Sequence, residues 1–275
     1  MRPFLTFIVG LLLPTGIAAV TLPATPLTPL YHALLTKRSD LAWQQLLISW
    51  PQISSAAQRD AWLQALDALI TVQCGNDLPV AIPDWLDHPS LSLIQRDMPL
   101  NRIYRVQLSG NSPSRQLRVV LSSPDGRDLM AGAEQEYNGS DGFSIQSQDL
   151  NKPLAAGIYL LTVRSGSEMW QQPLALQGSN HLNWIQLQQG KIKLHPPTVA
   201  ASCPAPWLEQ ALLRRDSFAQ VAWHRSDDLQ LHNWPPRDDA ENLWGTASVI
   251  RVEARGGVTL RFEHRMAGPL LTLKN

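Results

Sequence analysis

A series of short apolar segments between residues 103 and 176 constrains the fold more than any other feature of this chain. In its clearest part, residues 154–164, a glycine-containing turn leads into a run of β-branched, aromatic and aliphatic residues that is typical of a strand. Both faces of that strand carry mostly apolar side chains, which predicts a central position in a sheet. Further strands are predicted at residues 91–94, 103–108, 117–121, 143–145 and 170–176. We therefore expect a central antiparallel β-sandwich over residues 91–178.

Helical periodicity precedes this region. Three segments between residues 27 and 70 repeat apolar side chains at the spacing of one helix face. Ser55 and Gln58 form a capping-box pattern at the start of the third segment. We expect a helical domain at residues 20–74, followed by a linker at 75–90 where Gly, Asn, Asp and Pro accumulate.

The last third, residues 179–275, has a less regular strand pattern. Residues 206–215 have apolar side chains at helical spacing and predict one short helix. Strands are predicted around it at residues 184–187, 191–194, 221–224, 229–232, 249–252 and 257–262. The expected fold class is therefore α+β and multidomain, with a short N-terminal helical bundle, a central antiparallel β-sandwich and a C-terminal β-rich domain with one inserted helix.

The N-terminal residues 1–19 have the pattern of a secretory signal peptide. A positive start precedes an apolar core at residues 4–13, and small residues then predict cleavage after Ala18 or Ala19. A transmembrane anchor is the competing interpretation, but this apolar core is short for a hydrocarbon layer of about 30 Å. We expect a periplasmic or secreted protein with no membrane span after cleavage.

The chain has only two cysteines, Cys74 and Cys203, and they do not form a Cys-x-x-Cys pair. In an oxidising compartment, two cysteines far apart in sequence favour a disulfide over a redox or metal site. A Cys74–Cys203 bridge would connect the helical part to the last third of the chain.

A strand at residues 104–108, a Pro-Asp-Gly turn at 124–126 and a Leu-x-x-Gly-x-Tyr-x-Leu-x-Val strand at 154–163 follow one another in the central region. This order resembles pre-peptidase C-terminal domains, which are accessory β-sandwiches of secreted bacterial proteins. The resemblance concerns structure and implies no active site. The whole architecture also resembles uncharacterised exported families of Gram-negative bacteria, some encoded beside envelope-sensing two-component systems.

The sequence contains no nucleophile elbow, zinc-protease motif, P-loop or dinucleotide-binding motif, which lowers the expectation of an enzyme, and we predict no cofactor. The 23 basic and 23 acidic residues balance, so there is no electrostatic indication of nucleic-acid binding. Between residues 224 and 239, histidines and aspartates supply ligand types suited to zinc or calcium, but their spacing fits neither site, and solvated loops are predicted. These residues are His224, Asp227, Asp228, His232, Asp238 and Asp239.

Tryptophan is frequent, with ten in the chain. Three lie on the apolar faces of the predicted helices, which favours a place in the core over ligand binding: Trp43, Trp50 and Trp62. Four crowd the last third, where an exposed ring could stack on a sugar: Trp207, Trp223, Trp234 and Trp244. Trp234, which precedes two prolines, is expected in an exposed loop, whereas Trp223 lies in an apolar strand and is expected in the core.

The sequence thus favours a non-enzymatic envelope protein that acts as a protein-interaction or sensing-accessory module. Its partner would be an envelope protein or a cell-wall component. The alternative is a secreted glycan-binding protein or hydrolase that uses loops of the last third. For that alternative, the candidate ligand-binding residues are Trp234, Trp244, Asp227 and Asp228.

Overall fold

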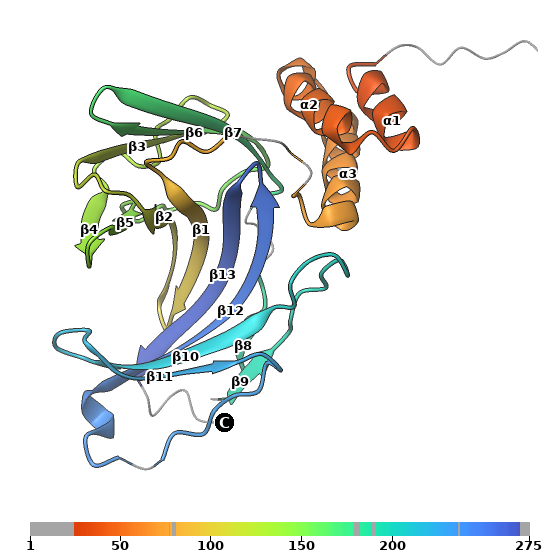
Figure 1. Ribbon diagram of the computed structural model, residues 1–275. Coiled ribbons are helices and arrows are strands. Elements are labelled where there is room, and N and C mark those ends of the chain that lie inside the picture. The colour runs from red at the N-terminus through yellow and green to blue at the C-terminus, as the bar shows by residue number, and fades with distance from the viewer. Residues whose placement is uncertain are drawn as a thin grey trace, which may run out of the picture.

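The computed structural model (Figure 1) describes residues 25–269 apart from residues 77, 79–80, 179–181, 189–190 and 236. The fold is mainly β, and a curled sheet of eight strands occupies its centre. The helices are α1 (Thr28–Leu35), α2 (Ser39–Ser49) and α3 (Ala56–Gln73), with short 3-10 helices η1 (Trp50–Gln52) and η2 (Ala240–Asn242). The strands are β1 (Asp87–Met98), β2 (Asn101–Asn111), β3 (Leu117–Ser122), β4 (Glu134–Asn138), β5 (Gly142–Gln146), β6 (Gly157–Ser165), β7 (Glu168–Leu176), β8 (Ile185–Gln188), β9 (Lys191–Leu194), β10 (Trp207–Arg214), β11 (Gln220–Ser226), β12 (Leu243–Arg255) and β13 (Val258–Pro269).

The eight strands follow the order β11-β10-β12-β13-β1-β2-β5-β4. Strands β1 and β13 pair in parallel, and the other neighbours in this sheet are antiparallel. The sheet therefore crosses the boundary that we placed between residues 178 and 179. The expected layout of a helical bundle, a separate sandwich and a C-terminal β-domain is wrong, because strands from both parts of the chain complete one mixed sheet.

The eight-stranded sheet has two faces of different character, because side chains alternate along each strand. Its convex face is mainly apolar: Leu93 lies opposite Phe262 on β13 and Val106 on β2, and all three are buried. The three-stranded sheet β3-β6-β7 and the β8–β9 hairpin pack on this face. Strand β6 is the central strand of the smaller sheet, as its two apolar faces predicted.

The three helices do not form a free-standing bundle. Their apolar cluster, which contains the fully buried Trp43 and Trp62, also includes Ala175 of β7 and packs against Ile158 of β6. Gly157 is required at this contact, because a Cβ atom there would lie 2.7 Å from the Trp50 ring. The capping box at Ser55 is confirmed. The helices are thus a layer attached to the outer side of the small sheet.

The helix expected at residues 206–215 is wrong, since β10 occupies that segment. Leu208 and Leu212 point to the convex face and are fully buried, while Trp207 and Ala211 lie on the other face. Apolar side chains on both faces produce a spacing that fits a helix as well as a strand, and pairing with β11 and β12 selects the strand. The strand expected at residues 229–232 does not form either.

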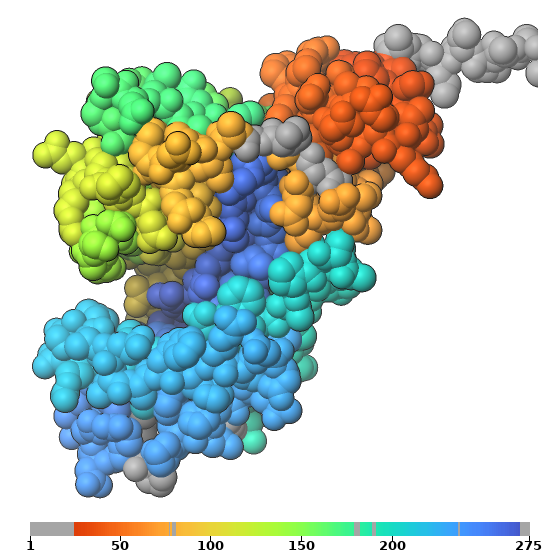
Figure 2. Space-filling model, viewed as in Figure 1, coloured from red at the N-terminus to blue at the C-terminus, as the bar shows by residue number. Residues whose placement is uncertain are grey.

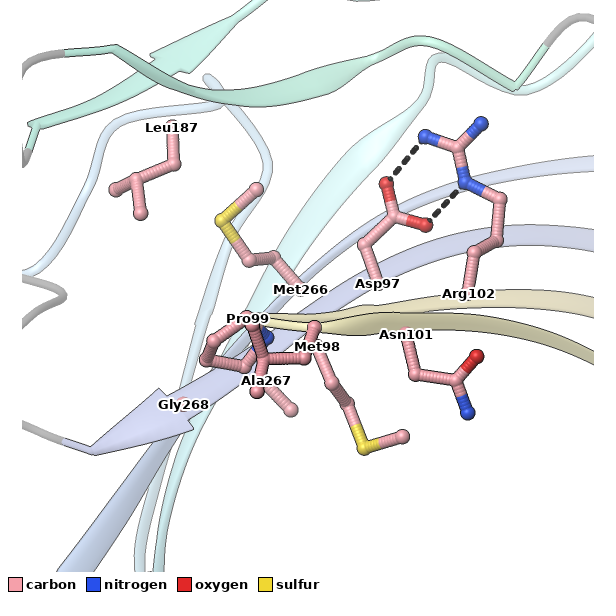
Figure 3. Close-up of a pocket in the computed structure, with 10 residues that line it drawn as sticks. Asp97, Met98, Pro99, Asn101, Arg102, Leu187, Met266, Ala267 and Gly268 are labelled. Atoms are coloured by element: carbon pink, nitrogen blue, oxygen red, sulfur yellow. Dashed lines mark hydrogen bonds and ion pairs between the residues drawn. The ribbon is translucent and has the colours of Figure 1, made fainter.

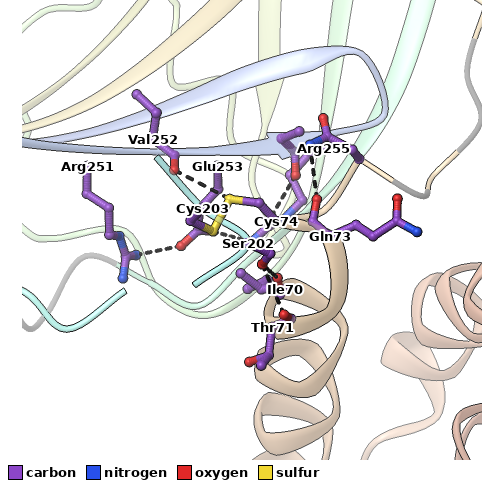
Figure 4. The surroundings of a disulfide bond; sticks show 12 residues. Ile70, Thr71, Gln73, Cys74, Ser202, Cys203, Arg251, Val252, Glu253 and Arg255 are labelled. Atoms are coloured by element: carbon purple, nitrogen blue, oxygen red, sulfur yellow. Dashed lines mark hydrogen bonds and ion pairs between the residues drawn. A yellow bond between two sulfur atoms is a disulfide. The ribbon is translucent and has the colours of Figure 1, made fainter. Parts of the chain in front are cut away.

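The Cys74–Cys203 disulfide is confirmed (Figure 4). It joins the C-terminal end of α3 to the loop before β10. At the same place, Ala254 donates a backbone hydrogen bond of 2.8 Å to the Cys74 carbonyl, and Gly75 lies against the Ala254 backbone. The predicted signal peptide lies outside the described residues. Among those described, no helix is long and apolar enough to cross a membrane.

Candidate functional site

The loop after β11 contains most of the residues that the sequence singled out. The His224 ring stacks on that of His232 with centroids 4.3 Å apart, and His232 meets the Trp234 ring edge-on at 4.6 Å. The Ser226 hydroxyl donates to Asp228, and this hydrogen bond lowers the pKa of the carboxyl group. Asp227 forms an ion pair of 2.8 Å with Arg225.

This loop does not present a metal site in the part of the chain that the structure describes, where no group of three or more His, Cys, Asp or Glu side chains is placed to hold an ion. Asp239 forms an ion pair of 2.8 Å with Arg237. Trp244 lies on β12, between Leu213 and Pro269 on the neighbouring strands, and is half-buried. The rings of His224, His232 and Trp234 therefore contact one another in turn, whereas Trp244 lies on strand β12 of the sheet.

Trp223 corrects one expectation, because its side chain is 52% exposed. It lies on β11, which is the last strand on its side of the sheet among the described residues and pairs there with β10. The strand pattern was interpreted correctly, but an edge strand buries much less than a central one.

A pocket of about 530 Å³ lies at the end of the β1–β2 hairpin (Figure 3). Met266 and Leu187 line one side, and Asp97 and Arg102 line another, with Arg102 Nε 2.6 Å from the Asp97 carboxylate. Partial burial favours a raised pKa for Asp97, but hydrogen bonds from His264 and Arg102 outweigh it and lower the pKa to about 2.

His264 is fully buried beside this pocket and uses both ring nitrogens. Its Nδ1 accepts backbone hydrogen bonds from Trp184 at 2.9 Å and Ile185 at 3.1 Å, and its Nε2 lies 3.1 Å from the Asp97 carboxylate. Two donors at Nδ1 fix the tautomer with the proton on Nε2. The histidine thus holds the start of β8 on β13 and has no nitrogen available for proton transfer to a ligand.

Replacing Asp97 with Asn is expected to lower the free energy of unfolding by about 2 kcal/mol at neutral pH. A carboxyl group whose pKa is lowered in the folded state stabilises the fold above its unfolded pKa, and this contribution is lost as the pH falls towards 2. Urea unfolding of both proteins from neutral pH down to about pH 2 measures the difference. The exposed Asp84→Asn variant is the control, and equal pH profiles for Asp97→Asn and wild type would contradict the assignment.

The concave face of the eight-stranded sheet carries a group of charged side chains. The register places on it Arg96 of β1, Arg105 of β2, Glu209 of β10, and Arg261, Glu263 and Arg265 of β13. Figure 2 shows the molecule recessed between the yellow-green part that contains β4 and β5 and the light-blue part that contains β10 and β11. The inner walls of this recess belong to the concave face (Figure 1).

Ion pairs organise the centre of the concave face. Glu263 is almost fully buried and accepts from Arg265 at 2.7 Å and from Arg261 at 3.4 Å, while Arg261 also pairs with Glu209 at 3.0 Å. Burial alone would raise the pKa of Glu263, but the two arginines lower it. The Trp207 ring lies next to this network, with the Arg225 guanidinium 4.5 Å from its centroid. The groups are therefore held in fixed positions.

Arg96 differs from the neighbouring arginines of this face in its hydrogen bonds. Arg105 pairs with Asp149 and Arg265 pairs with Glu263, but the buried Nε atom of Arg96 has no hydrogen-bond partner among the described residues. Burial lowers the pKa of Arg96, the charges of Arg265 and Arg105 lower it further, and the charge of Asp149 opposes this shift without cancelling it. Arg96 and Arg265 are register partners on adjacent strands, where like charges destabilise a sheet.

This face was not predicted from the sequence. The signal was present in residues 261–265, Arg-Phe-Glu-His-Arg, where charged side chains alternate with an aromatic and a histidine. Such alternation predicts one polar face of a strand. It does not indicate which strands lie beside β13, and the arginines gather only through that pairing.

One family model matches residues 23–270 and is described as a protein of unknown function (DUF2861). No curated protein matches this chain. The family match covers all of the described residues, including every strand of the concave face. The chain therefore belongs to the DUF2861 family.

Proposed function

We propose that this protein is an exported, non-enzymatic module of the cell envelope that binds a partner protein through the concave face of its large sheet. The ordered network of arginines and carboxylates on that face, around Glu263, is the observation that carries the proposal. The Cys74–Cys203 bridge supports export, since disulfides persist in oxidising compartments. An accessory of an envelope-sensing system is one form of this role.

The concave face has the chemistry of a recognition surface. Arginine and tryptophan are the side chains most enriched among residues that dominate binding energy, and this face presents both. Apart from that of Arg96, its guanidinium groups are held by ion pairs such as Arg261–Glu209, so little side-chain freedom is lost when a partner binds. Charged groups in fixed positions also select partners by complementary charge.

Cross-linking in the native envelope tests this proposal. A photo-reactive amino acid placed at Gln107 on β2 or at Thr246 on β12, both on the concave face, is expected to capture one common envelope protein. The yield is expected to fall as the salt concentration rises, because salt screens exposed charges. The cross-linked species are compared by gel electrophoresis and mass spectrometry.

The same photo-reactive residue at Arg118, an exposed position of β3 in the small sheet, is the control. Equal capture from Arg118 and from the concave positions would show that the contact is not specific to this face. Capture of glycan rather than protein, lost in a Trp234→Ala variant, would instead favour the alternative of a glycan-binding protein.

A further inference from the structure

We infer that Arg96 is the receptor for a single carboxylate carried by an acidic segment of the partner protein. This inference rests on the proposed function and names the chemistry of the segment that the concave face binds. Three observations support it: the position of Arg96 among the other arginines, the balance of charge around it, and the acidic rim of the face.

Arg96 lies among arginines that each pair with a carboxylate, but it lacks such a pair itself among the described residues. It lies on β1 between β2 and β13, next to Arg265 in the register and diagonal to Arg105, which lies opposite Ile94. Both neighbours hold a carboxylate, Glu263 and Asp149, whereas Arg96 has a buried Nε without a partner among the described residues. A guanidinium offers a planar pair of donors that matches a carboxylate.

The positive and negative charges of this network do not balance, and one further negative charge would neutralise it. Arg96 and the ion pairs of the network together contain four guanidinium groups and three carboxylates, which leaves one positive charge in excess. The guanidinium groups belong to Arg96, Arg105, Arg261 and Arg265, and the carboxylates to Asp149, Glu209 and Glu263. One aspartate or glutamate from a partner neutralises this excess.

The rim of the concave face excludes a polyanion. Glu134 and Glu136 on the edge strand β4 are in phase with the concave side chains of β5 and are exposed. These two carboxylates would repel a nucleic acid or a densely phosphorylated surface. A peptide segment with one acidic side chain can place its carboxylate on Arg96 and keep other side chains away from the rim.

Peptide selection tests the inference with a defined probe. The oxidised mature protein is immobilised and used to select from a phage-displayed library of random linear peptides. Wild type is expected to enrich Asp or Glu at one fixed position. Arg96→Met is expected to lose that enrichment, and Arg96→Glu to select Lys or Arg there instead. Arg118→Met and Arg118→Glu, on exposed β3, are the matched controls and are expected to select as wild type does.

Affinity then measures the pair itself. For a selected peptide, a Glu→Gln change is expected to weaken binding to wild type by about ten- to a hundredfold, since hydrogen bonds between charged groups contribute about 1.5–3 kcal/mol. The same change is expected to have no effect on binding to Arg96→Met. The thermal midpoint of Arg96→Met should not fall, because the buried Nε of Arg96 has no hydrogen-bond partner among the described residues and the charges of Arg265 and Arg105 oppose that of Arg96.

Other outcomes overturn the inference in distinguishable ways. Selected peptides without an acidic position, or acidic peptides that bind Arg96→Met equally well, would refute the role of Arg96 and leave the proposed function standing. Stronger binding of a phosphoserine peptide than of its glutamate counterpart would replace the carboxylate by a phosphate. Failure to select any peptide, together with no cross-linking from Gln107 and Thr246, would refute both the inference and the proposed function.

Discussion

Replacing Cys74 and Cys203 together by serine is expected to lower the free energy of unfolding by about 2–5 kcal/mol. The bridge joins positions 129 residues apart, so its loss restores a large amount of conformational freedom to the unfolded chain. It also releases the end of α3 from the loop before β10. Urea unfolding with and without reductant measures the effect, and reduced wild type should match the double variant.

Ser202→Ala is the matched control for the disulfide. The Ser202 hydroxyl donates a hydrogen bond of 3.0 Å to the Thr71 carbonyl beside the bridge, so this change removes a neighbouring contact and keeps the disulfide. It is expected to cost about 1 kcal/mol. A double serine variant within about 1 kcal/mol of wild type would show that the bridge does not stabilise the fold.

Arg255→Met is the second substitution with a large expected effect, a loss of about 3–5 kcal/mol in the free energy of unfolding. The Arg255 side chain is fully buried where β12 ends, and it donates to the Glu253 carboxylate at 2.6 Å, to the Ala254 carbonyl at 2.7 Å and to the Ala175 carbonyl at 3.0 Å. Its guanidinium also lies 5.4 Å from the Trp43 ring centroid in α2. One side chain therefore joins both sheets and the helical layer.

The loss arises because methionine removes hydrogen-bond donors from buried polar groups. Glu253 would keep only its 3.0 Å ion pair with Arg251, and the Ala175 carbonyl would lose its side-chain partner. Urea unfolding measures the free energy, and hydrogen exchange should show reduced protection in α1–α3. Arg118→Met, on exposed β3, is the control, and a loss below about 1 kcal/mol for Arg255→Met would contradict this role.

Local patterns predicted the local features of this fold. The capping box at Ser55, the central strand β6 and the disulfide each depend on a short segment or on the number of cysteines in the chain. The arrangement of the sheet depends on pairs such as Leu93 with Phe262, which no local pattern contains. The helix at residues 206–215 was wrongly predicted for the same reason. That segment forms β10 because it pairs with β11 on one side and β12 on the other, and neither partner belongs to the local pattern.

The candidate site was harder to predict than the fold. The loop residues chosen from the sequence are polar and turn-forming, and Asp227 and Asp239 form ion pairs with arginines two residues away. No sequence motif marks Arg96. Its environment is unusual because β13 places a second arginine, Arg265, beside it. A buried Nε without a hydrogen-bond partner among the described residues results from which strands lie side by side, and the sequence does not show which strands these are.

The position of β13 has a consequence for the order in which this protein folds. Strand β13 lies between β12 and β1, so it joins the last strands in the sequence to the first ones. A chain that emerges from a ribosome or a translocation channel keeps one edge of β1 open until residues 258–269 have also emerged. Contacts so distant in sequence form slowly, and open edges promote aggregation. The concave face is therefore incomplete on a chain from which residues 258–269 have not yet emerged.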